Sequence, residues 1–167
     1  LTTLTARLLL ELDNVLQAEK PDVVLVQGDT TTVMSVAMAC FYHRIPIGHV
    51  EAGLRTWDME NPVPEEANRV ITGKLARWHF APTEGSRQKL LREGVQDSDI
   101  LVTGNTVIDA LLMTAAKDIE VGIDIDANKR LVLITSHRRE NFGQPFRNIC
   151  QALRTLAENN SDVQFLY

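Results

Sequence analysis

The sequence predicts an α/β protein built on a doubly wound parallel sheet, and two patterns support this prediction. Short apolar runs rich in β-branched residues alternate with segments whose apolar residues recur at helical spacing. The connections between these segments are short, as they are in βαβ units. The chain has 167 residues, which is long enough to bury a hydrophobic core.

The first three elements form the start of a βαβ unit. A helix is predicted over residues 2–19, where apolar side chains recur at helical spacing, and Pro21 ends it. Residues 23–26 are fully apolar, as expected of a central strand in a parallel sheet. The turn Gly28–Thr31 connects this strand to an apolar helical segment at residues 33–42.

The same pattern then repeats along the chain. Strands are predicted at residues 45–50, 79–81 and 100–103, and helices at residues 64–76, 84–93 and 106–117. The helix over residues 64–76 has proline in its first turn, with Glu65 and Glu66 beside the positive end of its dipole. Gly94 closes the helix that follows.

Residues 119–129 interrupt the alternation of strands and helices. They are acidic and polar and show no clear period, which is typical of a linker between domains. We therefore predict the later part of one Rossmann-like domain over residues 1–118 and the start of a second over residues 130–167. The second part is predicted to contain a strand at residues 131–135, a helix from about Pro145 and a strand at residues 163–167.

Composition and charge argue against several classes of protein. A net charge of −5 gives no support for nucleic-acid binding, which usually shows a basic stripe. No apolar stretch reaches the roughly 18 residues of a membrane span, and no signal-peptide pattern is present. Cys40 and Cys150 lie in apolar helical patterns, so we expect two buried, reduced thiols in a cytoplasmic protein. Because the chain opens on Leu1 in a helical pattern and closes on Tyr167 in a strand pattern, we expect a fragment.

Polar side chains follow four of the predicted strands, at the edge where open parallel sheets bind ligands. They are Asp29, Glu51 and Asn105 and the group His137, Arg138, Arg139 and Glu140. So many ionisable and amide groups at strand ends predict a binding or catalytic site at this edge.

The carboxylates also have structural interpretations. Asp29 can cap the helix that follows it. Glu51 can pair with Arg55, because a buried carboxylate is costly without a partner. Glu65 and Arg69 are four residues apart on a helix, a spacing typical of a surface salt bridge.

The histidines fall into two groups. His49 and His79 lie in strand patterns and are expected to be packed and hydrogen-bonded, while His43 lies at a helix end and is expected to meet the helix dipole. His137 opens a polar, basic loop ahead of a helix N-terminus, which is a ready anion site. The sequence has no GxGxxG fingerprint after a strand, no Walker A motif, no GxSxG and no HExxH. Dinucleotide-binding, hydrolase and zinc-enzyme interpretations are therefore not supported.

Five motifs together resemble one family. In chain order they are QGDTTT (Gln27–Thr32), HVEAGLRT (His49–Thr56), PEEANR (Pro64–Arg69), TGNTVIDAL (Thr103–Leu111) and SHRRENFG (Ser136–Gly143). This set resembles the bacterial, non-hydrolysing UDP-N-acetylglucosamine 2-epimerases, over essentially the whole chain. The resemblance implies two Rossmann-like domains in a GT-B-like arrangement, with the nucleotide-sugar cleft between them. Compared with that family, the chain lacks the N-terminal strand and phosphate-binding loop and most of the C-terminal domain.

The resemblance also implies an activity. Enzymes of this family interconvert UDP-GlcNAc and UDP-ManNAc by eliminating UDP, through 2-acetamidoglucal, and adding it back, without a cofactor or an essential metal. A homodimer that supplies precursors of cell-surface polysaccharides is expected. Two alternatives stay open: a hydrolysing relative that releases ManNAc and UDP, and a catalytically inactive GT-B-like fragment that binds a sugar nucleotide or has a structural role.

The matching motif positions imply the site residues. Asp29, Glu51 and Glu65 match the family's three acidic catalytic residues, and His137 matches a histidine implicated in catalysis. The substrate-binding residues implied are Asp29, Glu51, Arg69, His137 and Arg138, with no metal site. Proton transfer on two faces of a sugar suits paired carboxylates whose pKa values are separated by burial and neighbours. Which carboxylate removes the proton and which returns it stays open.

Overall fold

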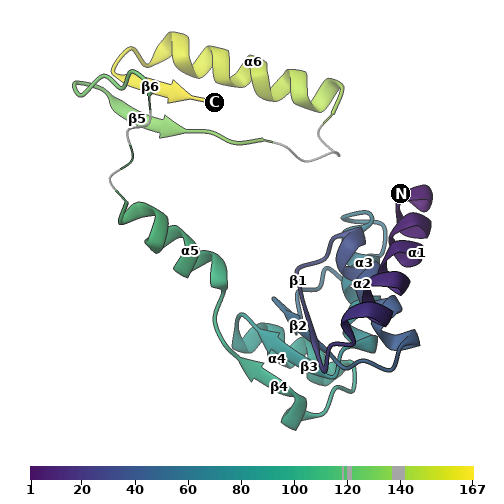
Figure 1. The fold of residues 1–167 in the computed structure, drawn as a ribbon. Coiled ribbons are helices and arrows are strands. Elements are labelled where there is room, and N and C mark those ends of the chain that lie inside the picture. The colour runs from purple at the N-terminus through teal and green to yellow at the C-terminus, as the bar shows by residue number, and fades with distance from the viewer. Residues whose placement is uncertain (118, 120–121, 137–141) are drawn as a thin grey trace. The chain divides into compact units, whose positions relative to one another are not determined.

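The computed structural model describes residues 1–117, 119, 122–136 and 142–167. The chain divides into two compact units, residues 1–117 and residues 118–167, and each contains parallel strands and helices (Figure 1). The assignment of residues 1–118, 119–129 and 130–167 to two domains and a linker of a longer enzyme stays a prediction.

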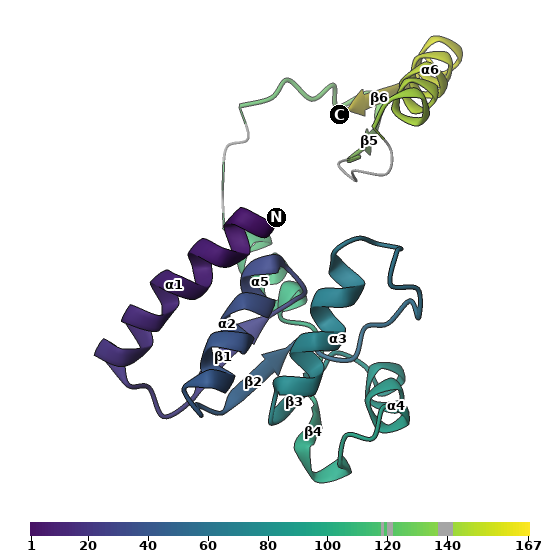
Figure 2. The same cartoon turned by 90° about the vertical axis from the view of Figure 1, so that its right-hand side faces the viewer.

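The first unit contains a four-stranded parallel sheet with the order β1-β2-β3-β4. Its elements are α1 (Thr2–Glu19), β1 (Val24–Gln27), α2 (Thr31–Tyr42), β2 (Ile47–Val50), α3 (Glu65–Leu75), β3 (Trp78–Ala81), α4 (Glu84–Arg92), a 3-10 turn (Asp97–Asp99), β4 (Ile100–Val102) and α5 (Thr106–Ala115). Because consecutive strands are neighbours, right-handed crossovers place α2, α3 and α4 on the same face of the sheet. Helix α1 packs against α2, and α2 packs against α3 (Figure 2). The helices and strands predicted from the sequence are confirmed, with bounds that differ by no more than two residues.

The main core of this unit lies where α1 and α2 cover β1 and β2. It consists of Leu16, Val26, Val33, Ala37, Ala39, Cys40 and Ile47. Small alanine side chains on α2 let that helix lie close to the sheet, and each large aliphatic side chain that is buried contributes about 1.5–3 kcal/mol. A second cluster joins α4 to the sheet through Ala52, Ala81, Leu90 and Ile100.

The two faces of the sheet differ in burial. His49, His79 and Ile100 lie side by side in register on the face under the helices, and all three are buried. On the opposite face, Leu25 and Leu101 are 64% and 47% exposed. The predicted α/β fold with a parallel sheet is confirmed, and within the described residues the helices that cover the sheet lie on one side of it.

The second unit is a βαβ unit. It consists of β5 (Arg130–Leu133), α6 (Gln144–Asn159) and β6 (Val163–Leu166), with β5 and β6 paired in parallel. Helix α6 half-buries Phe146, Ile149 and Leu153, whereas Cys150 lies beside this apolar stripe and is exposed. The expectation of two buried thiols is therefore confirmed for Cys40 and wrong for Cys150. None of the helices in the described ranges is long and apolar enough to cross a membrane.

Candidate active site

The carboxyl ends of β1, β2 and β4 carry the polar residues that the sequence predicts there. Asp29 follows β1, Glu51 follows β2, and Asn105 follows β4. Because the strands are parallel, these ends share one edge of the sheet. A Cβ atom added to Gly28 would lie 3.7 Å from a carboxylate oxygen of Glu51, and the amide nitrogen of Asn105 lies 3.5 Å from the other oxygen. Glu51 therefore lies beside the exit of β1 and contacts Asn105 at the exit of β4.

Asp29 is held by side chains from α3. The Nη2 atom of Arg69 lies 3.1 Å from Oδ2 of Asp29, and Nδ2 of Asn68 donates a 2.9 Å hydrogen bond to its backbone carbonyl. The cap of α2 is Thr30, whose hydroxyl accepts a hydrogen bond from the backbone N–H of Val33. Thr30 has the extended backbone that immediately precedes the first helical residue, which is the capping position. The interpretation of Asp29 as a helix cap is therefore wrong.

Arg55 does not pair with Glu51. Its Nε and Nη2 atoms bind the two carboxylate oxygens of Glu93 at 2.6 and 2.8 Å, and the Arg55 side chain is fully buried in this pair. The physical reason is the backbone: Glu51 and Gly53 both have left-handed conformations, with φ of 67° and 87°, and turn the chain between Glu51 and Arg55. Glu51 instead contacts the neutral amide of Asn105.

Glu66 was not singled out from the sequence as a site residue, yet its carboxylate is fully buried next to the site. The backbone N–H groups of Thr56 and Trp57 donate hydrogen bonds to it at 3.1 and 2.9 Å, and Nε of Arg69 lies 3.3 Å away. Burial by itself raises the pKa of Glu66, but these donors and the guanidinium outweigh it and hold that pKa below its ordinary value. Glu66 is therefore ionised at neutral pH.

The predicted salt bridge between Glu65 and Arg69 on the protein surface is wrong. Arg69 is buried and forms ion pairs with Asp29 and Glu66, while the hydrogen bond that it donates to Glu65 goes to the backbone carbonyl. Glu66 competes successfully because it is three residues before Arg69, on the side of α3 that packs inward. The Glu65 side chain is half-buried in the first turn of α3, at the positive end of the helix dipole.

His49 and His79 are packed and hydrogen-bonded inside the unit, as predicted. His49 donates a 2.8 Å hydrogen bond to the carbonyl of Gly28, and His79 lies beside it in register and hydrogen-bonds to the backbone. Burial lowers the pKa of His49, and burial together with repulsion from His49 lowers the pKa of His79 to about 4. Both rings are therefore neutral at pH 7. His43, at the C-cap of α2, contacts Asp13 of α1 at 2.7 Å.

His137 and Arg138 lie outside the described residues, as do Arg139 and Glu140, so their roles stay predictions. Among the residues that the structure describes, no three His, Cys, Asp or Glu side chains are grouped as a metal site requires.

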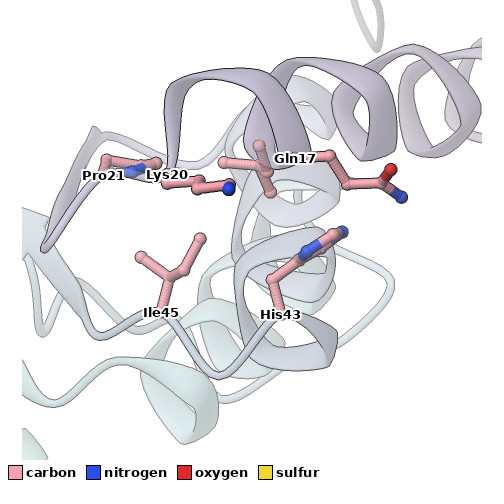
Figure 3. A pocket seen from close by; sticks show the side chains of 6 residues that line it. Gln17, Lys20, Pro21, His43 and Ile45 are labelled. Atoms are coloured by element: carbon pink, nitrogen blue, oxygen red, sulfur yellow. The ribbon is translucent and has the colours of Figure 1, made fainter.

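A pocket of about 500 Å³ lies where the end of α1 approaches the end of α2 (Figure 3). Its lining residues are Leu16, Gln17, Lys20, Pro21, His43 and Ile45. Pro21 precedes β1 and Ile45 precedes β2, so this pocket is at the amino ends of the strands. It is therefore at the opposite end of the sheet from Asp29 and Glu51, and it is separate from the candidate active site.

A parallel α/β sheet with ionisable side chains at the carboxyl ends of its strands is the arrangement of Rossmann-like proteins that act on small molecules. The family model described as UDP-N-acetylglucosamine 2-epimerase matches residues 1–167, so the chain belongs to this family. Curated relatives of that name from Salmonella typhimurium and Escherichia coli (strain K12) are 54% and 52% identical to it. Each alignment covers 100% of this chain and 47% of the relative, so the chain spans about half the length of these relatives.

Solved structures agree with this membership. The UDP-GlcNAc 2-epimerase from Neisseria meningitidis, bound to UDP-GlcNAc, has a TM-score of 0.90 and 45% identity over 96% of this chain and 46% of its own. The enzyme from Methanocaldococcus jannaschii, in complex with UDP-GlcNAc and UDP, has a TM-score of 0.82 and 38% identity over 96% of this chain and 46% of its own. The predicted Rossmann-like α/β fold, GT-B-like in these relatives, is thereby confirmed.

Proposed function

We propose that the protein containing this chain is a UDP-N-acetylglucosamine 2-epimerase that interconverts UDP-GlcNAc and UDP-ManNAc. The observation that carries the proposal is the pair of carboxylates, Asp29 and Glu51, at neighbouring strand exits of a sheet whose relatives are epimerases. Relatives solved with UDP-GlcNAc and UDP support the substrate class. We further propose that the protein is a cytoplasmic homodimer that supplies precursors of cell-surface polysaccharides.

Inversion at sugar carbon 2 requires one proton to leave and another to return on the opposite face. In the proposed elimination, a carboxylate takes the proton from carbon 2 and the electrons of that bond form the double bond between carbons 1 and 2. The bond from carbon 1 to oxygen breaks, and UDP leaves with its electron pair. Re-addition of UDP reverses these steps after a second acid protonates the other face of carbon 2. Two carboxylates with different surroundings suit these two proton transfers, one as the base and the other as the acid.

The different surroundings of Asp29 and Glu51 support separate roles for the two carboxylates. Asp29 lies beside the Arg69 guanidinium, whereas Glu51 contacts the neutral amide of Asn105. Glu65, at the start of α3, is proposed as the third acidic catalytic residue, with its half-buried carboxylate near the helix dipole.

We propose that His137 and Arg138 contact the pyrophosphate. An imidazole and a guanidinium suit the negative charge that develops as UDP departs. Arg69 is proposed to bind substrate through the same edge of the sheet, next to Asp29.

The decisive experiment uses the full-length protein that contains these 167 residues, incubated with UDP-GlcNAc in heavy water. We expect UDP-ManNAc to form and deuterium to enter carbon 2 of both sugars, which proton NMR detects. Free ManNAc as the dominant product would show the hydrolysing reaction instead. Absence of both turnover and exchange would refute the proposal.

Amide variants test the two carboxylates. Asp29→Asn and Glu51→Gln should each lower kcat by about 100-fold or more, because each removes a proton-transfer group. Glu84→Gln is the matched control, since Glu84 is an exposed carboxylate on α4. Its kcat should equal that of the wild type, and near-wild-type turnover in Asp29→Asn or Glu51→Gln would remove that residue from the catalytic set.

A further inference from the structure

Glu66 is a buried carboxylate for which the proposed chemistry has no direct use. It follows Glu65 in the first turn of α3 but is only 1% exposed. Its oxygens accept hydrogen bonds from two consecutive backbone N–H groups, those of Thr56 and Trp57. These two residues belong to the segment that leaves β2 after Glu51, so Glu66 ties α3 to that segment.

Glu66 also binds Arg69, and Arg69 binds Asp29. The Nε atom of Arg69 lies 3.3 Å from Oε2 of Glu66, and its Nη2 atom lies 3.1 Å from Oδ2 of Asp29. A guanidinium is planar and rigid, so the direction of Nε fixes the direction of Nη2. The Nε–H group itself donates a hydrogen bond to the backbone carbonyl of Glu65. The charge of Glu66 and this carbonyl therefore together set the angle at which Arg69 reaches Asp29.

Glu66 contributes to the geometry of the site. Taking a carboxylate out of water costs free energy, and its hydrogen bonds and ion pair outweigh that cost and keep Glu66 ionised in one fixed place. Two different parts of the site hold it: the segment after Glu51 donates the hydrogen bonds, and the Arg69 guanidinium forms the ion pair. A displacement of about 1 Å in a reacting group can cost about 100-fold in rate.

We propose that Glu66 is a positioning residue of the epimerase reaction, which orients Arg69 and, through it, the carboxylate of Asp29. The proposal rests on the proposed epimerase function. Glu66 does not touch the substrate, because its carboxylate is buried and its hydrogen bonds are made within the protein.

The test is Glu66→Gln in the full-length protein. Glutamine keeps the shape of the side chain, but its NH2 group faces donors, so the contact with Arg69 or with the backbone N–H groups is lost. We expect kcat to fall by about 10- to 100-fold. We expect KM for UDP-GlcNAc to change by less than about threefold, because binding of the substrate does not involve Glu66 directly.

A double-mutant cycle with Arg69→Lys shows whether Glu66 acts through Arg69. Lysine has a single point of charge and cannot hold two carboxylates in a fixed geometry. If the proposal is right, the variant with both substitutions will lose no more kcat than whichever of Glu66→Gln and Arg69→Lys loses more by itself. Losses that multiply would overturn it, as would a Glu66→Gln variant with wild-type kcat.

The matched control is Glu93→Gln, which weakens the other buried arginine–carboxylate pair, the one with Arg55. We expect its kcat to stay within about threefold of the wild type at temperatures where it is folded, because this pair does not include Arg69. Thermal melting checks the fold of each variant. If Glu66→Gln does not fold, Glu66→Asp, which keeps the charge and loses reach, replaces it in the same cycle. A wild-type protein without epimerase activity would instead refute the proposed function.

Discussion

Acidification should destabilise the first unit through His79. This ring is buried beside His49, and burial, with repulsion from His49 and Arg55, lowers its pKa to about 4. In the unfolded chain the pKa is near its ordinary value of 6.5. Between these two values the unfolded chain binds a proton that the folded chain does not. The contribution of His79 to the free energy of unfolding is therefore fully present well above pH 6.5. It decreases as the pH falls from about 6.5 to about 4, and it does not decrease further below about pH 4.

The magnitude follows from the two pKa values. One pKa unit corresponds to about 1.4 kcal/mol, so the loss from His79 alone is about 2 kcal/mol at pH 5. Urea unfolding at pH 7.5 and pH 5.0, followed by tryptophan fluorescence, measures it. Trp57 and Trp78 are the two tryptophans of the sequence, and both lie in the first unit, so the signal reports on that unit.

The control is His79→Gln, which removes the titrating ring. Groups that do not contact His79 change with pH in the same way in both proteins, so their contribution cancels when the two losses are subtracted. We expect the wild type to lose about 2 kcal/mol more than the variant between pH 7.5 and pH 5.0. Equal losses in the two proteins would refute the reasoning.

Two further predictions concern backbone and capping. Gly53→Ala should cost at least about 3 kcal/mol of unfolding free energy, because φ is positive and a Cβ would overlap the Ser86 carbonyl oxygen. The control is Gly94→Ala: Gly94 has a similar positive φ, but a Cβ added there would contact nothing, so the cost should be only about 1 kcal/mol. Equal losses of unfolding free energy for the two variants in urea titrations would show that the clash at Gly53 is not important. Thr83→Ala should cost about 1 kcal/mol, since the hydroxyl caps α4 by accepting from the N–H of Ser86. Ser98→Ala, at an exposed position, should change stability by less than about 0.5 kcal/mol, and a similar loss in both variants would argue against the cap.

The position of the site could be predicted from the sequence because it follows from strand direction. Once the apolar runs are assigned to parallel strands, Asp29, Glu51 and Asn105 must lie at one edge of the sheet. The histidines in strand patterns could be assigned for a similar reason, since the register of neighbouring strands places His49 and His79 side by side under the helices.

The partners of the charged residues could not be predicted, because they depend on turns and helix packing. Arg55 binds Glu93, 38 residues further along the chain, after a left-handed turn at Glu51 that no propensity indicates. Glu65 and Glu66 are adjacent and chemically alike, and which of them faces inward is decided by how α3 packs. Motif positions predict a role for Glu65, whereas Glu66 could only be found from its buried contacts.

The approach of Gly53 to the Ser86 carbonyl has a consequence for how Glu51 moves. Two backbones that touch without an intervening side chain have no rotamers that can absorb a displacement, so the turn and α4 shift together. The freedom of the Glu51 carboxylate is then limited to its own side-chain torsions. Because Gly53 has only a hydrogen atom where other residues have a side chain, the backbone that carries Glu51 is held rigidly against α4.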